Sequence, residues 1–416
     1  MKYNLEEVRS KIEEEIKKPV EVASIVDIVQ NLIIFGFLNR ASDIHFQPRE
    51  KYLIVRYRID GITHNIFNIP KELHEEIITR IKIVSNLRID EHFAAQDGRF
   101  RFYLEDENLS FFDVRVSIMP TYYGENAILR LLVNPGKKFN LENLGLSERD
   151  LNEIKKAISR PYGMILATGP TGSGKTTMLY TILNELNKEG VHIITIEDPI
   201  EYAIEGVTQI QVNPQTNLTF GKGLRAILRQ DPDIIMVGEI RDTETAEIAV
   251  NAALTGHLLL STLHTNDAPS AAIRLIELGV EPYLITSTVN AIIGQRLIRT
   301  ICNYCKKQRK LTPKEKESVL QLVHEKNREK FENLEVVSYG EGCKNCNNTG
   351  YMGRTGIYEV LTLNEELRDL ILTKSSSTEL KEKAIELGMT TMLEDGLSKV
   401  LQELTTIEEV LRVTHE

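Results

Sequence analysis

At 416 residues the chain exceeds one compact domain, and about two to four domains are expected. Its composition, 42% apolar and 26% charged, is typical of a packed globular protein and excludes wholesale disorder. Fifty Lys and Arg against 60 Asp and Glu give a formal charge of −10, which argues against a dedicated nucleic-acid binder. A small basic pore or a local basic face stays open.

No apolar run reaches the ~18–20 residues that a membrane-spanning helix needs. The N-terminus, MKYNLEEVRSKIEEE, lacks the apolar segment of a secretory signal. We therefore expect a cytoplasmic protein that reaches a membrane only through partners. The chain holds four cysteines, too few for a disulfide scaffold of this length, so they need another explanation.

The first part of the chain is predicted to be a small α+β domain. Residues 1–22 mix charges with scattered apolar residues, which predicts a short solvated helix or arm. Apolar residues at helical spacing predict a helix from Val22 to Asn39. Alternating runs such as ASDIHFQP, YLIVRYRIDGITHNI, GRFRFYLE, FFDVRVSIMPTYY and NAILRLLV predict strands, with one helix across Lys71–Leu87. The domain is expected over 23–132, followed by a turn-rich linker at 133–145.

Beyond the linker, apolar strand-like runs alternate with helices. The runs are GMILAT, HIITI, GVTQIQV, DIIMVGE and HLLLSTL, and helices are predicted from Lys175, at Gly223–Arg229 and at Thr243–Ala253. This alternation predicts an α/β domain over residues 146–300, a mainly parallel sheet with helices on both faces. Cysteines, glycines and basic residues set 301–356 apart as a metal-binding insert. Amphipathic segments predict a helical tail at 357–416.

A phosphate-binding loop is the most specific motif. GPTGSGKT matches G-x-x-x-x-G-K-[ST], with a strand before it and a helix after it. Glycines let backbone N–H groups wrap phosphate oxygens, and the helix N-terminus adds a positive dipole end. Lys175 is expected to reach the β- and γ-phosphates, and the Thr176 hydroxyl to ligate Mg²⁺. The predicted nucleotide-binding residues are Gly169, Pro170, Thr171, Gly172, Ser173, Gly174, Lys175, Thr176 and Thr177.

Acids at two strand ends are candidates for the metal and water chemistry. DIIMVGE ends in Glu239, placed where an acid would lie beside Mg²⁺. IITIEDPIEY ends a second strand in Glu197 and Asp198, and at least one acid should orient or polarise the attacking water. His257 and His264 flank a third apolar strand. A lone histidine is more often a satisfied core residue, but beside a nucleotide His264 could sense the γ-phosphate.

Two CxxC pairs account for every cysteine: Cys302, Cys305, Cys343 and Cys346. Two such pairs can place four thiolates tetrahedrally around Zn²⁺ at Zn–S distances of ~2.3 Å. Because a four-thiolate site has no open coordination position, this zinc would be structural and would hold the segment Lys306–Gly342. An iron–sulfur cluster, a redox pair and an empty site stay as alternatives.

Taken in order, these motifs resemble the type IV pilus assembly and type II secretion ATPase family. The resemblance begins at about Ala41 and covers almost all of the chain from there. It rests on ASDIHFQP, VRYRIDG, QDGRF and DVRVSIMPTYYGENAILRLL, then on GPTGSGKTT, ITIEDPIEY, DPDIIMVGEIRD, TGHLLLSTLHTNDA, IGQRLIR and GYMGRTGIYEV. The cysteines favour an assembly or secretion motor, because retraction motors of the family generally lack them. Too few residues precede Ala41 for the additional N-terminal domain of many assembly members, so either a naturally short form or a truncated chain is expected.

The resemblance implies a RecA-like P-loop ATPase domain preceded by a PAS-like domain, assembled as a homohexamer. Such motors hydrolyse ATP with Mg²⁺ and act on an inner-membrane platform protein to extrude pilin or pseudopilin subunits. By this resemblance Glu239 is the Walker B acid and Glu197 the second candidate for handling water. The family's arginine fingers, worth ~10³–10⁵ in rate in related enzymes, map onto Arg115 and Arg130. For each, a surface ion pair is the alternative role.

Three other functions stay open. A retraction or competence-type motor of the same superfamily would carry most of the same motifs. A RecA-like DNA translocase is disfavoured by the charge of −10, the absence of Trp and the lack of an aromatic and basic platform, so no nucleic-acid partner is expected. A structural hexamer without activity is disfavoured because the P-loop and both candidate acids are intact.

Overall fold

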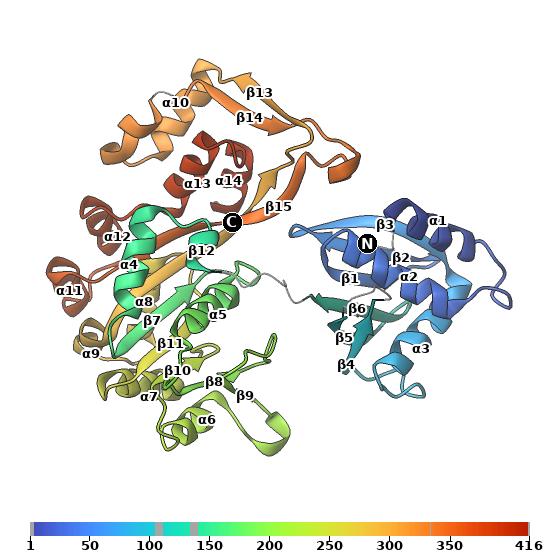
Figure 1. The fold of residues 1–416 in the computed structure, drawn as a ribbon, viewed down its shortest axis with the longest axis horizontal. Helices are drawn as coiled ribbons and strands as arrows, with labels where there is room; N and C mark the ends of the chain where they lie inside the picture. Colours follow the sequence, from blue (N-terminus) through green and yellow to red (C-terminus); the bar gives the residue numbers. More distant parts are fainter. Residues whose placement is uncertain (1–3, 105–110, 134–139, 333, 415–416) are drawn as a thin grey trace. The chain divides into compact units, whose positions relative to one another are not determined.

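The computed structural model describes residues 4–104, 111–133, 140–332 and 334–414, which belong to two compact units, 1–136 and 137–416 (Figure 1). Of the expected linker, 134–139 lie outside the described residues, and 140–145 include a 3₁₀ turn at Leu141–Asn143. None of the helices described is long and apolar enough to cross a membrane.

The N-terminal unit is a six-stranded antiparallel sheet in the order β3-β2-β1-β6-β5-β4. Its strands are β1 (Ala41–Pro48), β2 (Tyr52–Ile59), β3 (Ile62–Pro70), β4 (Gln96–Tyr103), β5 (Phe111–Thr121) and β6 (Gly124–Leu132). Its helices are α1 (Leu5–Glu15), α2 (Ile25–Leu38) and α3 (His74–Val84), the last preceded by a 3₁₀ turn at Lys71–Leu73. The α+β character expected from the sequence is confirmed, while the likeness to a PAS domain stays a prediction.

The N-terminal helix differs from the solvated arm that we expected. Val8, Ile12 and Ile16 recur every four residues and are buried in the same apolar cluster as α2 and the sheet. Glutamates and lysines outnumber the residues of this narrow apolar stripe, so the composition of the segment predicted a solvated helix or arm. The helix expected to reach Leu87 ends earlier, since α3 is followed by Asn86 with φ of 55°.

The C-terminal unit is built on a seven-stranded sheet in the order β15-β12-β7-β11-β10-β8-β9. The strands are β7 (Gly163–Thr168), β8 (Ile193–Glu197), β9 (Thr208–Gln211), β10 (Ile234–Val237), β11 (Leu258–Leu263), β12 (Val289–Ile301) and β15 (Tyr351–Leu361). All neighbours are parallel except β12 and β15. The predicted mainly parallel sheet is therefore confirmed.

Helices cover both faces of this sheet, because both faces of its strands are apolar. Along β7, Met164 and Leu166 enter one apolar cluster while Ile165 and Ala167 enter the other. The second cluster is covered by α4 (Glu148–Ile158) and α5 (Lys175–Leu186). The first is covered by α6 (Phe220–Ile227), α7 (Thr243–Leu254), α8 (Ala268–Glu277) and α9 (Pro282–Thr288).

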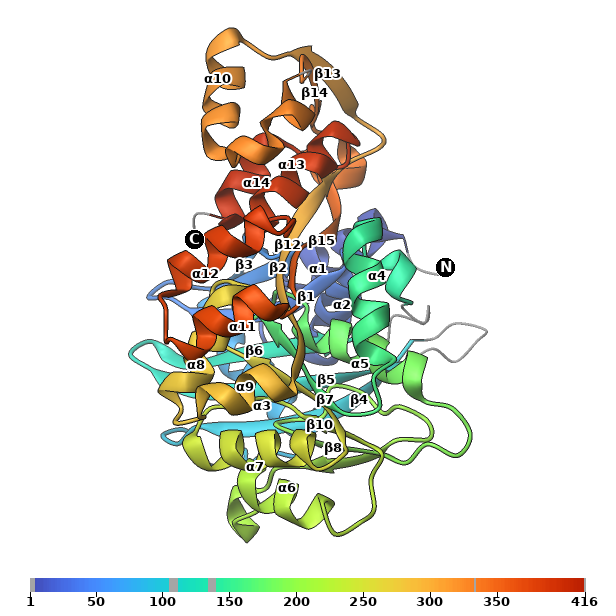
Figure 2. The ribbon, with the colours of Figure 1, turned by 90° about the vertical axis from the view of Figure 1, so that its left-hand side faces the viewer.

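A small lobe and four helices complete the unit (Figure 2). The lobe has the antiparallel pair β13 (Lys306–Lys310) and β14 (Val336–Gly340), with α10 (Pro313–Leu322) and a 3₁₀ segment at Glu325–Phe331. The tail is helical as expected: α11 (Glu365–Leu372), α12 (Ser377–Glu386), α13 (Met392–Leu401) and α14 (Ile407–Thr414). One apolar cluster joins the lobe to α13 and α14, and β15 runs across residue 356, the expected end of the insert.

Candidate nucleotide and metal sites

The phosphate-binding loop joins β7 to α5 at the carboxyl edge of the sheet. β7 is buried at every residue and lies between β11 and β12. Gly169 has φ of 144°, and a Cβ there would lie 2.4 Å from the Gln295 carbonyl oxygen. Gly174 has φ of 92° and caps α5. Glycine is needed at both positions, since a side chain would be strained and, at Gly169, would collide with the β12 backbone.

The interior of the loop fits an anionic ligand. The Lys175 ammonium donates to the carbonyl oxygens of Gly169 at 2.7 Å and Pro170 at 3.0 Å. Burial lowers the pKa of Lys175 to about 8, against the opposing attraction of Glu239. Ser173 Oγ and Gln295 Oε1 are buried and find no hydrogen-bond partner among the residues described. Such groups cost ~1–3 kcal/mol each when unpaired. The Ser173 hydroxyl can donate to a phosphate oxygen, whereas Gln295 Oε1 only accepts and fits a donor such as an ordered water.

Glu239 and His264, singled out separately in the sequence, lie together in the structure. Glu239 follows β10 and His264 follows β11, and these neighbouring parallel strands end at the same edge. The buried Glu239 carboxylate lies 2.9 Å from His264 Nε2 and 2.6 Å from Arg241 Nη2. Both partners are about half or more exposed. Sequence reasoning missed Arg241, although it stands only two residues after Glu239.

Glu197 ends β8 and is held by a different set of partners. Its Oε1 accepts hydrogen bonds from Thr195 Oγ1 at 2.6 Å and Gln209 Nε2 at 3.1 Å, and its Oε2 accepts one from the Tyr180 hydroxyl. Burial, followed by the charge of Glu197, raises the pKa of Tyr180, so the phenol stays a donor. Tyr180 lies on α5, so this bond ties the P-loop helix to the acid. The sequence does contain a signal for Thr195, because it is a polar residue inside a buried apolar strand.

The remaining candidates have simpler surroundings. His257 lies with Nδ1 3.0 Å from the Ala252 carbonyl oxygen, a local contact of the kind expected for a structural histidine. Arg115 on β5 and Arg130 on β6 are direct cross-strand neighbours in the N-terminal unit. Arg130 Nε lies 2.9 Å from Asp43 Oδ1, a partner that the sequence did not reveal.

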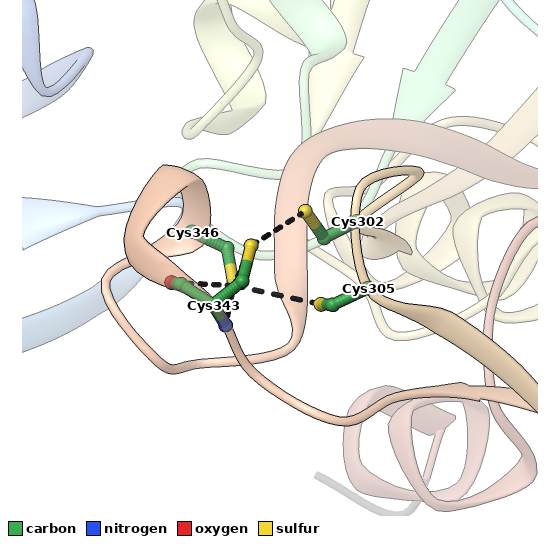
Figure 3. A group of neighbouring side chains, drawn as sticks. All are labelled: Cys302, Cys305, Cys343 and Cys346. Carbon is green, nitrogen blue, oxygen red and sulfur yellow. Dashed lines mark hydrogen bonds between the residues drawn. The ribbon is translucent and has the colours of Figure 1, made fainter.

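The four cysteines converge from two loops (Figure 3). Their Sγ atoms lie within 4.8 Å of one another, with 3.8 Å between Cys302 and Cys343, 3.8 Å between Cys305 and Cys346, and 3.7 Å between Cys343 and Cys346. These separations are too long for disulfides. A tetrahedron with metal–sulfur bonds of ~2.3 Å has sulfur–sulfur edges of about 3.8 Å, so the cluster fits a four-thiolate metal site.

The thiols differ in their readiness to ionise. Burial opposes ionisation of Cys346, but the N–H groups of Cys343 and Gly350 lie at 3.2 and 3.3 Å from its sulfur and lower its pKa to about 6. Burial raises the pKa of Cys305 to about 12. Burial also raises the pKa of Cys302, so Cys302 and Cys305 would ionise at neutral pH only when a metal ion stabilises their thiolates.

A mainly parallel sheet with a P-loop at its carboxyl edge and acids at the ends of β8 and β10 along the same edge defines a P-loop ATPase. Residues 18–412 match the model of the type II/IV secretion system protein family, and the chain belongs to that family. It is 44% identical over 398 residues to the type IV pilus assembly ATPase PilB of Myxococcus xanthus, covering 96% of this chain and 69% of that protein. It is 43% identical over 403 residues to type II secretion system protein E of Pseudomonas aeruginosa, covering 97% and 78%.

Two solved structures share the fold of this chain. The pilus retraction motor PilT with bound ADP is 27% identical, with a TM-score of 0.61 and coverage of 92% of this chain and 96% of that one. The Legionella pneumophila ATPase DotB is 22% identical and shares the fold, with a TM-score of 0.67 and coverage of 92% and 94%. The P-loop ATPase fold and the ATP hydrolase class expected from the sequence are confirmed.

Proposed function

We propose that this ATPase is the motor of a type IV pilus assembly or type II secretion machine. It works as a homohexamer at the cytoplasmic side of the inner membrane, where a platform protein converts its movements into the addition of pilin or pseudopilin subunits. The observation that carries the proposal is the P-loop beside the Glu239–His264 pair. The names of the 43–44% identical relatives support the choice of machine.

Within the site, each residue has a distinct role. The loop amides and Lys175 hold the phosphates, while Thr176 and Glu239 hold Mg²⁺, which neutralises charge on the phosphates. Glu197, fixed by its three donors, orients the attacking water. Because His264 contacts Glu239, a change at the metal reaches the end of β11. Arg115 and Arg130 act as fingers on a nucleotide bound by a neighbouring subunit.

The cysteine cluster supports assembly or secretion rather than retraction, and we propose that it binds zinc. Zinc there links the ends of β12 and β14 to the start of β15 and so holds the lobe. Metal analysis should find about one zinc per chain, and Cys302→Ser should lose it. An iron chromophore, or metal-free protein from a zinc-replete preparation, would refute this assignment.

The motor role is tested in the host. Lys175→Ala at the chromosomal locus should abolish surface filaments or secretion of the machine's substrates, while the exposed Lys188→Ala should leave them intact. If filaments instead accumulate in the Lys175→Ala strain, the chain is a retraction motor. If DNA stimulates ATP hydrolysis by the purified protein, the chain is a translocase and the proposal fails.

A further inference from the structure

One carboxylate in the N-terminal unit lies at the centre of a row of arginines. In the cross-strand register, Arg58, Asp43, Arg130 and Arg115 stand opposite one another on the adjacent strands β2, β1, β6 and β5. Like charges directly opposite each other destabilise a sheet, whereas an acid between two arginines offsets part of that repulsion. Asp43 therefore separates Arg58 from Arg130, whereas Arg115 faces Arg130 directly and Arg99 on β4 faces Arg115.

The contacts of Asp43 are unequal. Its Oδ1 lies 2.9 Å from Arg130 Nε, and its Oδ2 lies 2.8 Å from Ser42 Oγ but 3.6 Å from Arg58 Nε. The Asp43 side chain is 7% exposed, while that of Arg130 is 55% exposed. A buried, twice-anchored carboxylate is a fixed point, whereas an exposed arginine is a long flexible chain. The ion pair therefore fixes the arginine rather than the acid.

The contact between Arg130 and Asp43 leaves part of the arginine guanidinium available. Arg130 is held through Nε, and its terminal nitrogens Nη1 and Nη2 make no hydrogen bond within the described part of the chain. A guanidinium offers five N–H donors in a planar fork, so it can be anchored by one edge and still present two terminal groups to an anion. Anchoring also removes rotamer freedom that would otherwise be lost when the anion is engaged.

We infer that Asp43 is a positioning residue for ATP hydrolysis, which holds Arg130 with its terminal nitrogens directed at the phosphates of a nucleotide bound by another copy of the chain. The inference rests on the proposed finger role of Arg130. Asp43 itself touches no substrate and acts through Arg130 alone. Its loss should therefore impair the chemical step and spare nucleotide binding, which the P-loop provides.

The test is steady-state ATPase kinetics of the purified, assembled protein carrying Asp43→Asn, which keeps the shape of the side chain and removes its charge. We expect kcat to fall about 10–100-fold with KM within about twofold, the scale of a misplaced catalytic group. Asp113→Asn is the matched control, because Asp113 Oδ1 lies 3.0 Å from Arg101 Nε in the same sheet, with both side chains about half exposed. A normal kcat for Asp43→Asn would overturn the inference.

A double variant separates this role from a structural one. If Asp43 acts through Arg130, adding Asp43→Asn to Arg130→Ala should cause no further loss of kcat. An equal loss in both backgrounds would mean that Asp43 only supports the fold, and the inference would be wrong. If Arg130→Ala alone keeps normal turnover, the finger role fails and the inference with it. Should Asp43→Asn not assemble, Asp43→Ser is judged by the same criteria.

Discussion

Glu239 and Glu197 lie at the carboxyl edge of the same sheet, yet their partners differ in mobility. Glu239 contacts Arg241 and His264, two side chains that are about half or more exposed and can rearrange. Glu197 is held by three donors from within the unit, all on ordered strands or on α5. This difference supports the proposed roles, with the metal at Glu239, whose contacts can be exchanged, and the orientation of water at Glu197.

Glu239→Gln should separate binding from turnover. Losing the carboxylate charge should lower kcat by ~10²–10⁴ while ATP still binds, because the P-loop is untouched. Nucleotide affinity measured by fluorescence and turnover measured by phosphate release check this. The control is Glu247→Gln, an acid on the surface of α7. Normal turnover of Glu239→Gln would exclude the metal role.

Among single residues, those that belong to a recognisable motif were predicted from the sequence. Those whose role depends on a tertiary contact were missed. Lys175, Glu197 and Glu239 follow strands or glycines in recognisable patterns. Tyr180 carries no local signal, and the motif ASDIHFQP, which contains Asp43, does not reveal the partner of that acid. Both roles depend on which strand or helix lies opposite in the fold. Pairing of β1 with β6 joins residues 87 positions apart, a contact that no local pattern encodes.

The last helix, α14, is fixed to the central sheet by one buried acid. Glu409 accepts from the Arg299 backbone N–H at 3.0 Å and side chain at 2.7 Å, and from Arg412 Nε at 2.9 Å. Although burial opposes ionisation, hydrogen bonds from Arg412 and then Arg299 outweigh it and lower the pKa of Glu409 below its ordinary value of 4.5. The charged form therefore stabilises the folded state.

Glu409→Gln should lower the free energy of unfolding by about 3 kcal/mol at neutral pH, since it leaves the charge of the part-buried Arg299 uncompensated. The exposed Glu408→Gln should change it by less than about 0.5 kcal/mol. Because the folded pKa is the lower one, the contribution is complete above about pH 4.5 and is lost as pH falls through the folded value. Urea unfolding at several pH values measures this, and a difference that is constant down to pH 3 would contradict it.

The presence and type of helices and strands were predicted better than the residues at which they end or the burial of their side chains. The parallel core followed from apolar runs alternating with helices, a pattern that dictates strands buried on both faces. The burial of α1 did not follow, because its apolar stripe is one residue wide and depends on α2 for a partner. Predicted helix ends moved by a few residues where a positive φ at Asn86 or a serine cap at Ser24 decided the boundary.

At the scale of the molecule, the proposed function places each active site between two chains, because the fingers of one chain act on the nucleotide bound by its neighbour. An assembly that requires a neighbour for each turnover couples hydrolysis to subunit motion. This arrangement makes a prediction that no single-chain enzyme would satisfy.

Mixing two inactive variants should restore activity. In a hexamer that contains Lys175→Ala and Arg130→Ala subunits, some interfaces pair an intact P-loop with an intact finger. About a quarter of interfaces qualify in a random equal mixture, so activity should rise well above that of either variant alone. Phosphate release after subunit exchange measures it, with each variant alone as control. No recovery in verified mixed hexamers would show that Arg130 acts within its own chain or not at all.

The strand β12 connects the surroundings of the P-loop with the cysteine cluster. Its Gly294 is paired with Thr168 beside the P-loop, and the strand, which is paired with β15, runs on to Ile301. Ile301 is next to Cys302 and lies about 23 Å along the strand from Gly294. Co²⁺ accepts the same tetrahedral thiolates and, unlike Zn²⁺, absorbs visible light. The visible absorption spectrum of a cobalt-loaded chain therefore reports on the geometry of the cysteine site. A change in this spectrum on adding ATP would show that motion is transmitted from the nucleotide to the far end of β12.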